Sequence, residues 1–215
     1  MGKIFDWIDA KFHVKAPHGG FLQRRLPEGL SYAYCLGGAA FTAYTILLFT
    51  GMLLSIYYVP SEHDAYSSIL RIQHEVHLGW LIRGMHKWSA TILIIFLIGH
   101  TLRVFISRAY RPPKELNWVV GVITMVSCFA SGFTGYLLPW DQKAYWATEV
   151  GTSMAHTIPA IGTYVMYFVR GGIDVDGTTL IRFYSIHVHW LPLGMLALLW
   201  MHFHMIKRQG IKRPL

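Results

Sequence analysis

Four histidines lie at matched spacings in two long apolar stretches of this sequence. His86 and His100 are 14 positions apart, and His187 and His202 are 15 positions apart. At about 100° per residue these steps rotate by about −40° and +60°, so each pair projects toward one side of its helix with about 21–22 Å between its members. If both helices run in the same direction, His86 faces His187 and His100 faces His202. Opposed imidazole pairs suit a haem that passes electrons and binds no oxygen.

Other interpretations of these histidines are open at this level. A single histidine within a membrane is often a hydrogen-bonded packing residue, but polar groups there are costly, and four in matched pairs indicate a function. Zinc would need a carboxylate or thiolate at the same depth, and the sequence places none there. His189 and His204 are also 15 positions apart, on the other side of the same helix. Spacing alone therefore does not choose between them and His187 with His202.

Glycines repeat the spacing in two other apolar stretches. Gly37 and Gly51 are 14 positions apart, and so are Gly121 and Gly135. A missing side chain lets a flat ligand or another helix come close to the backbone. Helix packing explains one such pair, whereas two pairs that share the histidine spacing favour clearance for two macrocycles.

The stretches that carry these residues are long enough to cross a membrane as helices. About 20 residues are needed for one crossing, and the candidates are approximately residues 31–58, 80–105, 116–138 and 185–206. Only 14% of the residues are charged, against about 25% in soluble domains. We therefore expect one domain over residues 1–215: an all-α membrane protein whose four transmembrane helices form a diheme four-helix bundle, with additional amphipathic helices at the surface.

Charge and two shorter segments describe how the bundle sits in its membrane. Residues 1–30 hold five basic residues and no cleavable signal sequence, and are expected to form an amphipathic arm. Residues 158–169 are apolar but too short to span, so they lie in the interface or against the bundle. Thirteen of the 19 basic residues fall on the side of both termini, which places the termini on the cytoplasmic, negative side. The basic residues behind the net charge of +8 form no basic face, so we expect the protein to contact membrane lipid and not to bind nucleic acid.

Several motifs resemble the cytochrome b family in its short b6-type form. They are YCLGG at Cys35, RGMHKW at His86, HTLR from His100, GFTGYLLPWDQ from Gly132, and RFYSIHVHWLP followed by HFHMIKRQG. The resemblance covers essentially the whole chain. It implies that His187 and His202 are the ligands in the fourth span, and the 15-residue step between them matches the b6-type branch.

The resemblance also implies the cofactors. Two b-type haems are expected, with ligands His86 and His187 on the outer side and His100 and His202 on the inner side. In this family the cysteine of the YCxGG segment forms one thioether to an extra c-type haem, which would be Cys35 here. A lone cysteine is otherwise most often a small buried hydrophobe.

Arginines and two further segments are candidates for contacts with cofactor and substrate. Arg83 and Arg103 lie one turn from the ligand histidines, toward the membrane edges, where their planar guanidinium groups would suit haem propionates. The alternative is that these arginines only flank the spans as the positive-inside rule requires. By resemblance, Gly135–Asp141 and the following segment Gln142–Met154 form part of an outer quinol pocket, although a helix stop with an aromatic belt also explains residues 139–141. The quinone-site candidates are Pro139, Trp140 and Asp141 on the outer side, and Lys207 and Arg208 on the inner side. A role as a cytoplasmic anchor also explains Lys207 and Arg208.

These expectations lead to a function that depends on other subunits. The chain would carry electrons between an outer quinol-oxidation site and an inner quinone-reduction site of a proton-translocating quinol oxidoreductase, without a conventional acid–base catalyst of its own. The resemblance implies a companion subunit with the remaining cytochrome b helices, a Rieske-type iron–sulfur protein, a c-type cytochrome and a homodimeric complex. The alternatives are a diheme membrane anchor of a dehydrogenase or hydrogenase, and a haem-free transporter or structural subunit that uses its histidines for protons or metal. The sequence does not distinguish a respiratory from a photosynthetic membrane, nor does it identify the quinone.

Overall fold

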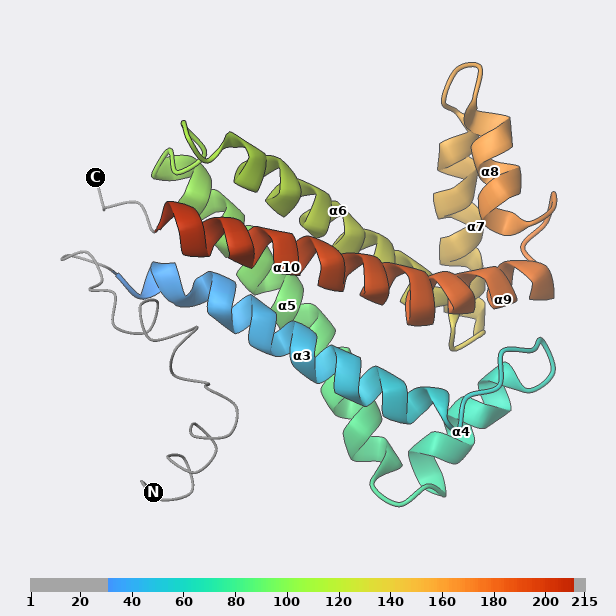
Figure 1. Cartoon of the computed structure of the whole chain (residues 1–215). Coiled ribbons are helices and arrows are strands. Elements are labelled where there is room, and N and C mark those ends of the chain that lie inside the picture. Colours follow the sequence, from blue (N-terminus) through green and yellow to red (C-terminus); the bar gives the residue numbers. More distant parts are fainter. Residues whose placement is uncertain (1–30, 211–215) are drawn as a thin grey trace, which may run out of the picture.

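Four long helices dominate the structure, a computed structural model that describes residues 31–210 (Figure 1). Each is long and apolar enough to cross a membrane, and their bounds are Tyr32–Ser55, Gly79–Ile106, Glu115–Leu137 and Gly177–Gln209. The all-α class and the four spans are thereby confirmed. The amphipathic arm expected over residues 1–30 lies outside the described residues.

The four spans are arranged as two close pairs. The first span comprises the short helix η1 (Tyr32–Cys35) and α3 (Leu36–Ser55), which packs along α5 (Gly79–Ile106). The third, α6 (Glu115–Leu137), packs along α10 (Leu191–Gln209). Between the pairs lies a central layer of buried side chains, namely Ala40, Ala43, Tyr44, Leu93, Cys128 and Met195. Along every span this layer lies between the two paired histidine or glycine positions of that span.

The fourth span begins earlier than expected, at Gly177 instead of near residue 185. Asp176 starts it, because its carboxylate accepts hydrogen bonds from the backbone N–H groups of Thr178 and Thr179 while the Thr179 hydroxyl accepts from the Asp176 N–H. The span consists of α9 (Gly177–Ser185), a single π-helical turn η2 (Ile186–Trp190), and α10.

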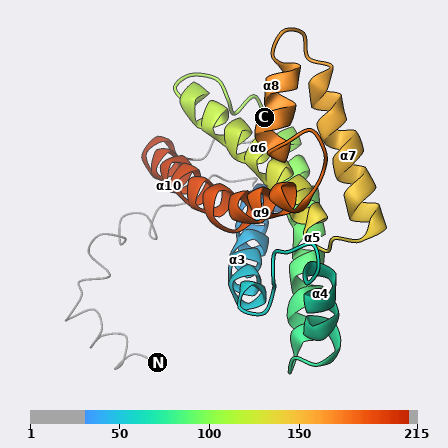
Figure 2. The same cartoon turned by 90° about the vertical axis from the view of Figure 1, so that its right-hand side faces the viewer.

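One end of the bundle carries most of the connecting structure. The helix α4 (Ala65–His74) leads from α3 to α5, while α7 (Gln142–His156) and α8 (Gly162–Arg170) form a hairpin that runs across the end of the bundle (Figure 1; Figure 2). The expected apolar segment 158–169 thus forms most of α8 and packs against α7. A second apolar core joins α4 to α6 and α9, and Tyr145 of α7 and Val169 of α8 pack against it; its buried residues are Tyr58, Ala65, Ile72, Leu137, Val175, Leu180 and Phe183.

The other end of the bundle brings the described ends of the chain together. Lys114 Nζ donates to the carbonyl of Gly210 at 2.7 Å, and Gln209 Nε2 donates to the carbonyl of Pro113 at 3.0 Å. These contacts tie the α5–α6 connection to the end of α10. The start of α3 lies at this same end (Figure 1), as an even number of spans requires.

Candidate functional site

His86 on α5 and His187 in η2 lie opposite each other near the hairpin end of the bundle. Their ring centroids are 6.3 Å apart, with an angle of 72° between the ring planes. His86 Nδ1 is 2.9 Å from the Thr50 hydroxyl, and His187 Nδ1 is 2.9 Å from the backbone carbonyl of Ser131. Both rings are therefore held from the side of their Nδ1 atoms by neighbouring helices.

These hydrogen bonds determine which nitrogen of each ring carries the proton. A carbonyl only accepts, so Nδ1 of His187 must donate to Ser131. The Thr50 hydroxyl already donates to the carbonyl of Ile46 at 2.7 Å, so it accepts from Nδ1 of His86. In both neutral rings Nε2, the nitrogen farther from the main chain, keeps a free lone pair. An Nδ1–H donated to a carbonyl or hydroxyl is the usual support of a histidine that binds metal through Nε2.

The second histidine pair lies at the opposite depth. A methyl group at Gly37 would lie 2.9 Å from Cε1 of His100, and one at Gly121 would lie 3.4 Å from Cε1 of His202. His100 and His202 are each half-buried and directed into the bundle. The inner pair is thus bordered by glycine in the same way as the outer one.

Each of the four predicted glycines faces one of the four histidine rings. At the outer level a methyl group at Gly51 would lie 3.2 Å from Cε1 of His86, and one at Gly135 only 2.5 Å from Cε1 of His187. The space that these glycines leave open in the structure therefore admits an imidazole edge. That they also border macrocycles stays a prediction.

The tertiary structure separates the two histidine pairs of the fourth span. His189 and His204 are exposed on the outside of the bundle, where His189 contacts the ring of Tyr184 and His204 stacks on Trp200 at 5.6 Å. His187 and His202 face inward toward α6. Of the two pairs that spacing allowed, the inward one alone can meet the histidines of α5.

The donor set fits a bis-imidazole haem better than a zinc ion. Within residues 31–210, no group of three or more histidine, cysteine or acidic side chains could hold a metal ion. A protein zinc site needs at least three such ligands, whereas a haem supplies four equatorial nitrogens and requires two axial ligands. The two opposed rings of His86 and His187, each bordered by a glycine, would supply that number of imidazoles.

The two predicted propionate arginines have different surroundings. Arg83 Nη1 donates to the side-chain carbonyl of Gln73 at 2.7 Å. Arg103 covers the ring of Tyr34, with 4.5 Å from its Cζ to the ring centroid, and its buried Nε has no hydrogen-bond partner. A buried donor without a partner is costly, so a carboxylate group beside Arg103 would stabilise it.

Cys35 is exposed, at the junction of η1 with α3, and is not disulfide-bonded. Its chain neighbours on both sides line an open groove of about 410 Å³; the described residues around it are Ala33, Tyr34, Leu36, Gly99, Leu102, Arg103, Ile106 and Ser107. Cys128 is instead buried in the central layer, with its sulfur 3.5 Å from that of Met195. A ligand could therefore reach the sulfur of Cys35 but not that of Cys128, which agrees with a packing role for Cys128.

The quinone-site candidates lie at opposite ends of the bundle. Pro139, Trp140 and Asp141 form the turn from α6 into α7, where Trp140 has a positive φ of 52° and Asp141 caps α7 by accepting from the Ala144 N–H at 2.8 Å. Lys207 and Arg208 are exposed in the last turn of α10. The cap gives Asp141 a structural role, and none of these positions shows which side chains would contact a quinone.

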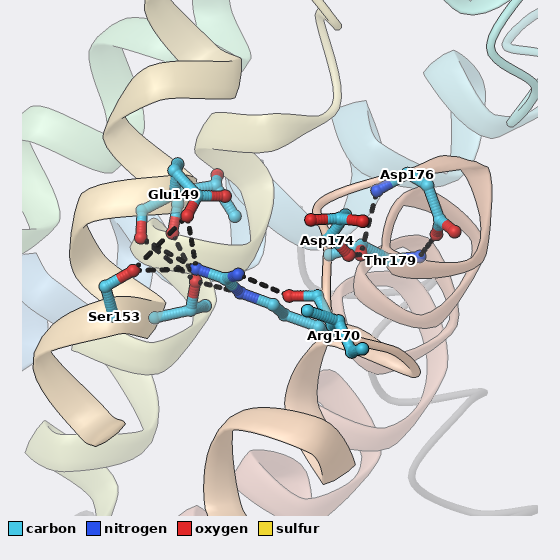
Figure 3. Close-up of polar contacts among 9 residues, drawn as sticks. Glu149, Ser153, Arg170, Asp174, Asp176 and Thr179 are labelled. Carbon is cyan, nitrogen blue, oxygen red and sulfur yellow. Dashed lines mark hydrogen bonds and ion pairs between the residues drawn. The ribbon is translucent and has the colours of Figure 1, made fainter. Parts of the chain in front are cut away.

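Arg170 is a residue whose role the sequence did not reveal. It is only 3% exposed, and it reaches from α8 to α7, where it contacts Glu149, Thr152 and Ser153 (Figure 3). Its Nη2 lies 2.9 Å from a Glu149 carboxylate oxygen, and its Nη1 donates to the carbonyl of Ile173 at 2.6 Å. The guanidinium thereby fastens the α7–α8 hairpin. The sequence around Arg170 gives no signal that this side chain is buried.

Replacing Arg170 with alanine is expected to destabilise the hairpin by about 2 kcal/mol, because it removes the buried guanidinium that binds Glu149, Thr152 and the Ile173 carbonyl. Thermal unfolding and protease cleavage of the α7–α8 connection would measure this effect. Lys143→Ala is the control, since Lys143 is exposed on α7, and should cost less than about 1 kcal/mol. The double variant Arg170→Met/Glu149→Leu should recover most of the loss; equal loss in the single and double variants would contradict the role of the ion pair.

Comparisons with known proteins agree with this arrangement. The family model for cytochrome b/b6/petB matches residues 21–210. Cytochrome b6 of Gracilaria tenuistipitata var. liui is 40% identical, and the menaquinol:cytochrome c reductase cytochrome b subunit of Bacillus subtilis (strain 168) is 42% identical, each over 100% of both chains. A solved structure described as a hyperthermophilic respiratory Complex III matches with a TM-score of 0.89 at 30% identity, over 97% of this chain and 56% of that one. The chain, which spans about half of that solved chain, belongs to the cytochrome b/b6 family.

Proposed function

We propose that this chain is a diheme cytochrome b subunit that carries electrons across a membrane between an outer quinol-oxidation site and an inner quinone-reduction site of a proton-translocating quinol oxidoreductase. The single observation that carries the proposal is the outer pair: His86 and His187 hold free Nε2 lone pairs on opposed rings with centroids 6.3 Å apart. The second pair at the other depth supports it, and so do relatives whose names describe quinol reductase subunits.

The side chains of this protein hold and orient the cofactors. A haem with two histidine ligands, when bound, gains and loses single electrons at its iron. Thr50 and Ser131 fix the tautomer and direction of the outer imidazoles, which sets ligand basicity. The central layer around Tyr44 and Met195 fills the bundle between the two levels, so that each pair occupies its own depth. The levels are about 21 Å apart along the helix axis.

The orientation in the membrane follows from charge. The bundle end at which the described chain begins and ends carries a basic set: Arg108, Arg111, Lys114, Lys207 and Arg208. The hairpin end carries an acidic set: Glu62, Asp64, Glu75, Asp141, Glu149, Asp174 and Asp176. The positive-inside rule then places both termini on the cytoplasmic or equivalent negative side of a multi-pass inner or thylakoid-type membrane.

The remaining parts of the reaction belong to partners. We place quinol oxidation at the hairpin end near Pro139–Asp141 and quinone reduction at the basic end. A companion subunit with the other cytochrome b helices, a Rieske-type iron–sulfur protein, a c-type cytochrome and a second copy of the complex would complete the assembly. The chain alone is expected to carry electrons without catalysing quinol oxidation.

Haem content tests this function directly. A reduced pyridine haemochrome spectrum of the purified membrane protein should give two extractable b-type haems per chain. A colourless protein would overturn the proposal and favour a haem-free transporter. Two b-type haems with no covalently attached haem, reduced by a dehydrogenase or hydrogenase without the companion cytochrome b subunit, would favour the membrane-anchor alternative.

We expect Cys35 to hold one further haem by a thioether bond. Its exposure beside the 410 Å³ groove near the inner histidines supports this assignment, as does the partnerless Nε of Arg103 at the same groove. After denaturing electrophoresis, haem staining should follow the unaltered chain and vanish in Cys35→Ala. Cys128→Ala is the matched control, because the chain has two cysteines and Cys128 is buried. Staining that persists in Cys35→Ala, or an unstained natural chain, would contradict the assignment.

A further inference from the structure

The fourth span contains a π-helical turn at His187, one member of the outer histidine pair. In η2 the backbone N–H of Leu191 bonds to the carbonyl of Ile186, five residues back. Such a turn holds one residue more than an α-helical turn, and turns of this kind are frequent at functional sites. His187 is the second residue of η2, while α3, α5 and α6 are uninterrupted between their own paired positions.

The turn removes a mismatch in helical register. The paired positions of α3, α5 and α6 are each 14 residues apart, whereas His187 and His202 are 15 apart. In a regular helix the fifteenth residue would add about 100° of rotation relative to the other spans. Because η2 takes up one residue, the step from His187 to His202 rotates like 14 α-helical residues.

Contacts with α6 agree with that restored register. Gly135 and Gly121, which are 14 positions apart, face His187 and His202 respectively. Without the turn, His187 could not face Gly135 while His202 faces Gly121. The inward direction of both rings therefore depends on where the extra residue is accommodated.

Two residues fix the turn at its position. Pro192 has no N–H, and in a regular helix its ring would clash with the carbonyl of Val188, four residues back; a wider turn relieves that clash. From α3, the Tyr44 hydroxyl donates to the carbonyl of Pro192 at 2.9 Å, and Tyr44 is only 4% exposed. Both residues lie between the two histidine levels along their spans.

We propose that η2 is a register device that absorbs the additional residue of the fourth span and so brings His187 into the outer pair, with Pro192 and Tyr44 as positioning residues. The inference rests on the proposed function, since it takes the two pairs to be haem ligands. It predicts that this span, unlike the others, tolerates the loss of one residue, provided that the residue is removed from the turn.

The test removes the turn and compares haem content. Deleting Val188 together with Pro192→Ala creates a 14-residue step in a regular helix and should keep two extractable b haems per chain. The matched control deletes Thr91, between His86 and His100 in uninterrupted α5, and should lose at least one of them. Loss of haem from the Val188 variant, when Pro192→Ala alone keeps both, would overturn the proposal, as would full loading of the Thr91 variant. Absence of haem from the natural chain would instead contradict the proposed function.

Tyr44→Phe tests the positioning role separately. In the natural helix it should shift the electron paramagnetic resonance signal of the outer haem and leave the inner signal unchanged. In the variant without the turn, the same substitution should have no effect, because the regular helix no longer depends on that hydrogen bond. An equal shift in both backgrounds would show that Tyr44 does not act through η2.

Discussion

Replacing His187 with leucine is expected to halve the extractable haem of the protein. Its Nδ1 is held by the Ser131 carbonyl, and its ring lies opposite that of His86, with the two centroids 6.3 Å apart. Leucine retains apolar volume but supplies no ligand atom, so only His86 of the outer pair would remain to hold a haem. The pyridine haemochrome spectrum, normalised to protein in the membrane, should fall from two b haems to one.

The next histidine on the same turn provides the control. His189 is exposed and contacts Tyr184 outside the bundle, so His189→Leu should retain both haems. The same contrast is expected at the inner level between His202→Leu and His204→Leu. Full loading of His187→Leu together with loss in His189→Leu would show that the other face of the fourth span holds the ligands.

A single methyl group at Gly135 is expected to weaken outer-haem binding by about tenfold or more. It would lie 2.5 Å from Cε1 of His187, well inside the carbon–carbon contact distance of about 3.5–4.0 Å. The backbone carbonyl that holds His187 comes from the same helix, so the ring cannot turn away without losing its hydrogen bond. Overpacking of this kind costs about 1–3 kcal/mol, and 1.4 kcal/mol corresponds to a factor of ten in affinity.

Gly132→Ala is the matched control, because Gly132 lies on the same helix and a methyl group there would meet nothing within 4 Å. Titration of haem into each variant, followed by its optical spectrum, should show full affinity for Gly132→Ala and reduced outer-site affinity for Gly135→Ala. Gly121→Ala should have a smaller effect, since its contact with His202 is 3.4 Å. Equal affinities for Gly135→Ala and Gly132→Ala would contradict a steric requirement at Gly135.

The regular spacing of residues along the chain already contained much of this architecture. The apolar runs predicted the four spans because a helix that crosses lipid must be apolar over a fixed length. The 14-residue steps in α3, α5 and α6 predicted two levels, because an uninterrupted helix converts sequence distance into depth and direction. The histidines and glycines of each level were therefore identifiable from the sequence.

Contacts between segments far apart in the sequence decided the rest. The π-helical turn that redirects His187, the bonds of Thr50 and Ser131 that fix the imidazole tautomers, and the burial of Arg170 between α7 and α8 all depend on such contacts. Spacing left His187 and His189 equivalent, because periodicity gives an angle about a helix axis but does not say which side meets another helix. Only the packing of η2 and α10 against α6 placed one of them inside the bundle and the other outside it.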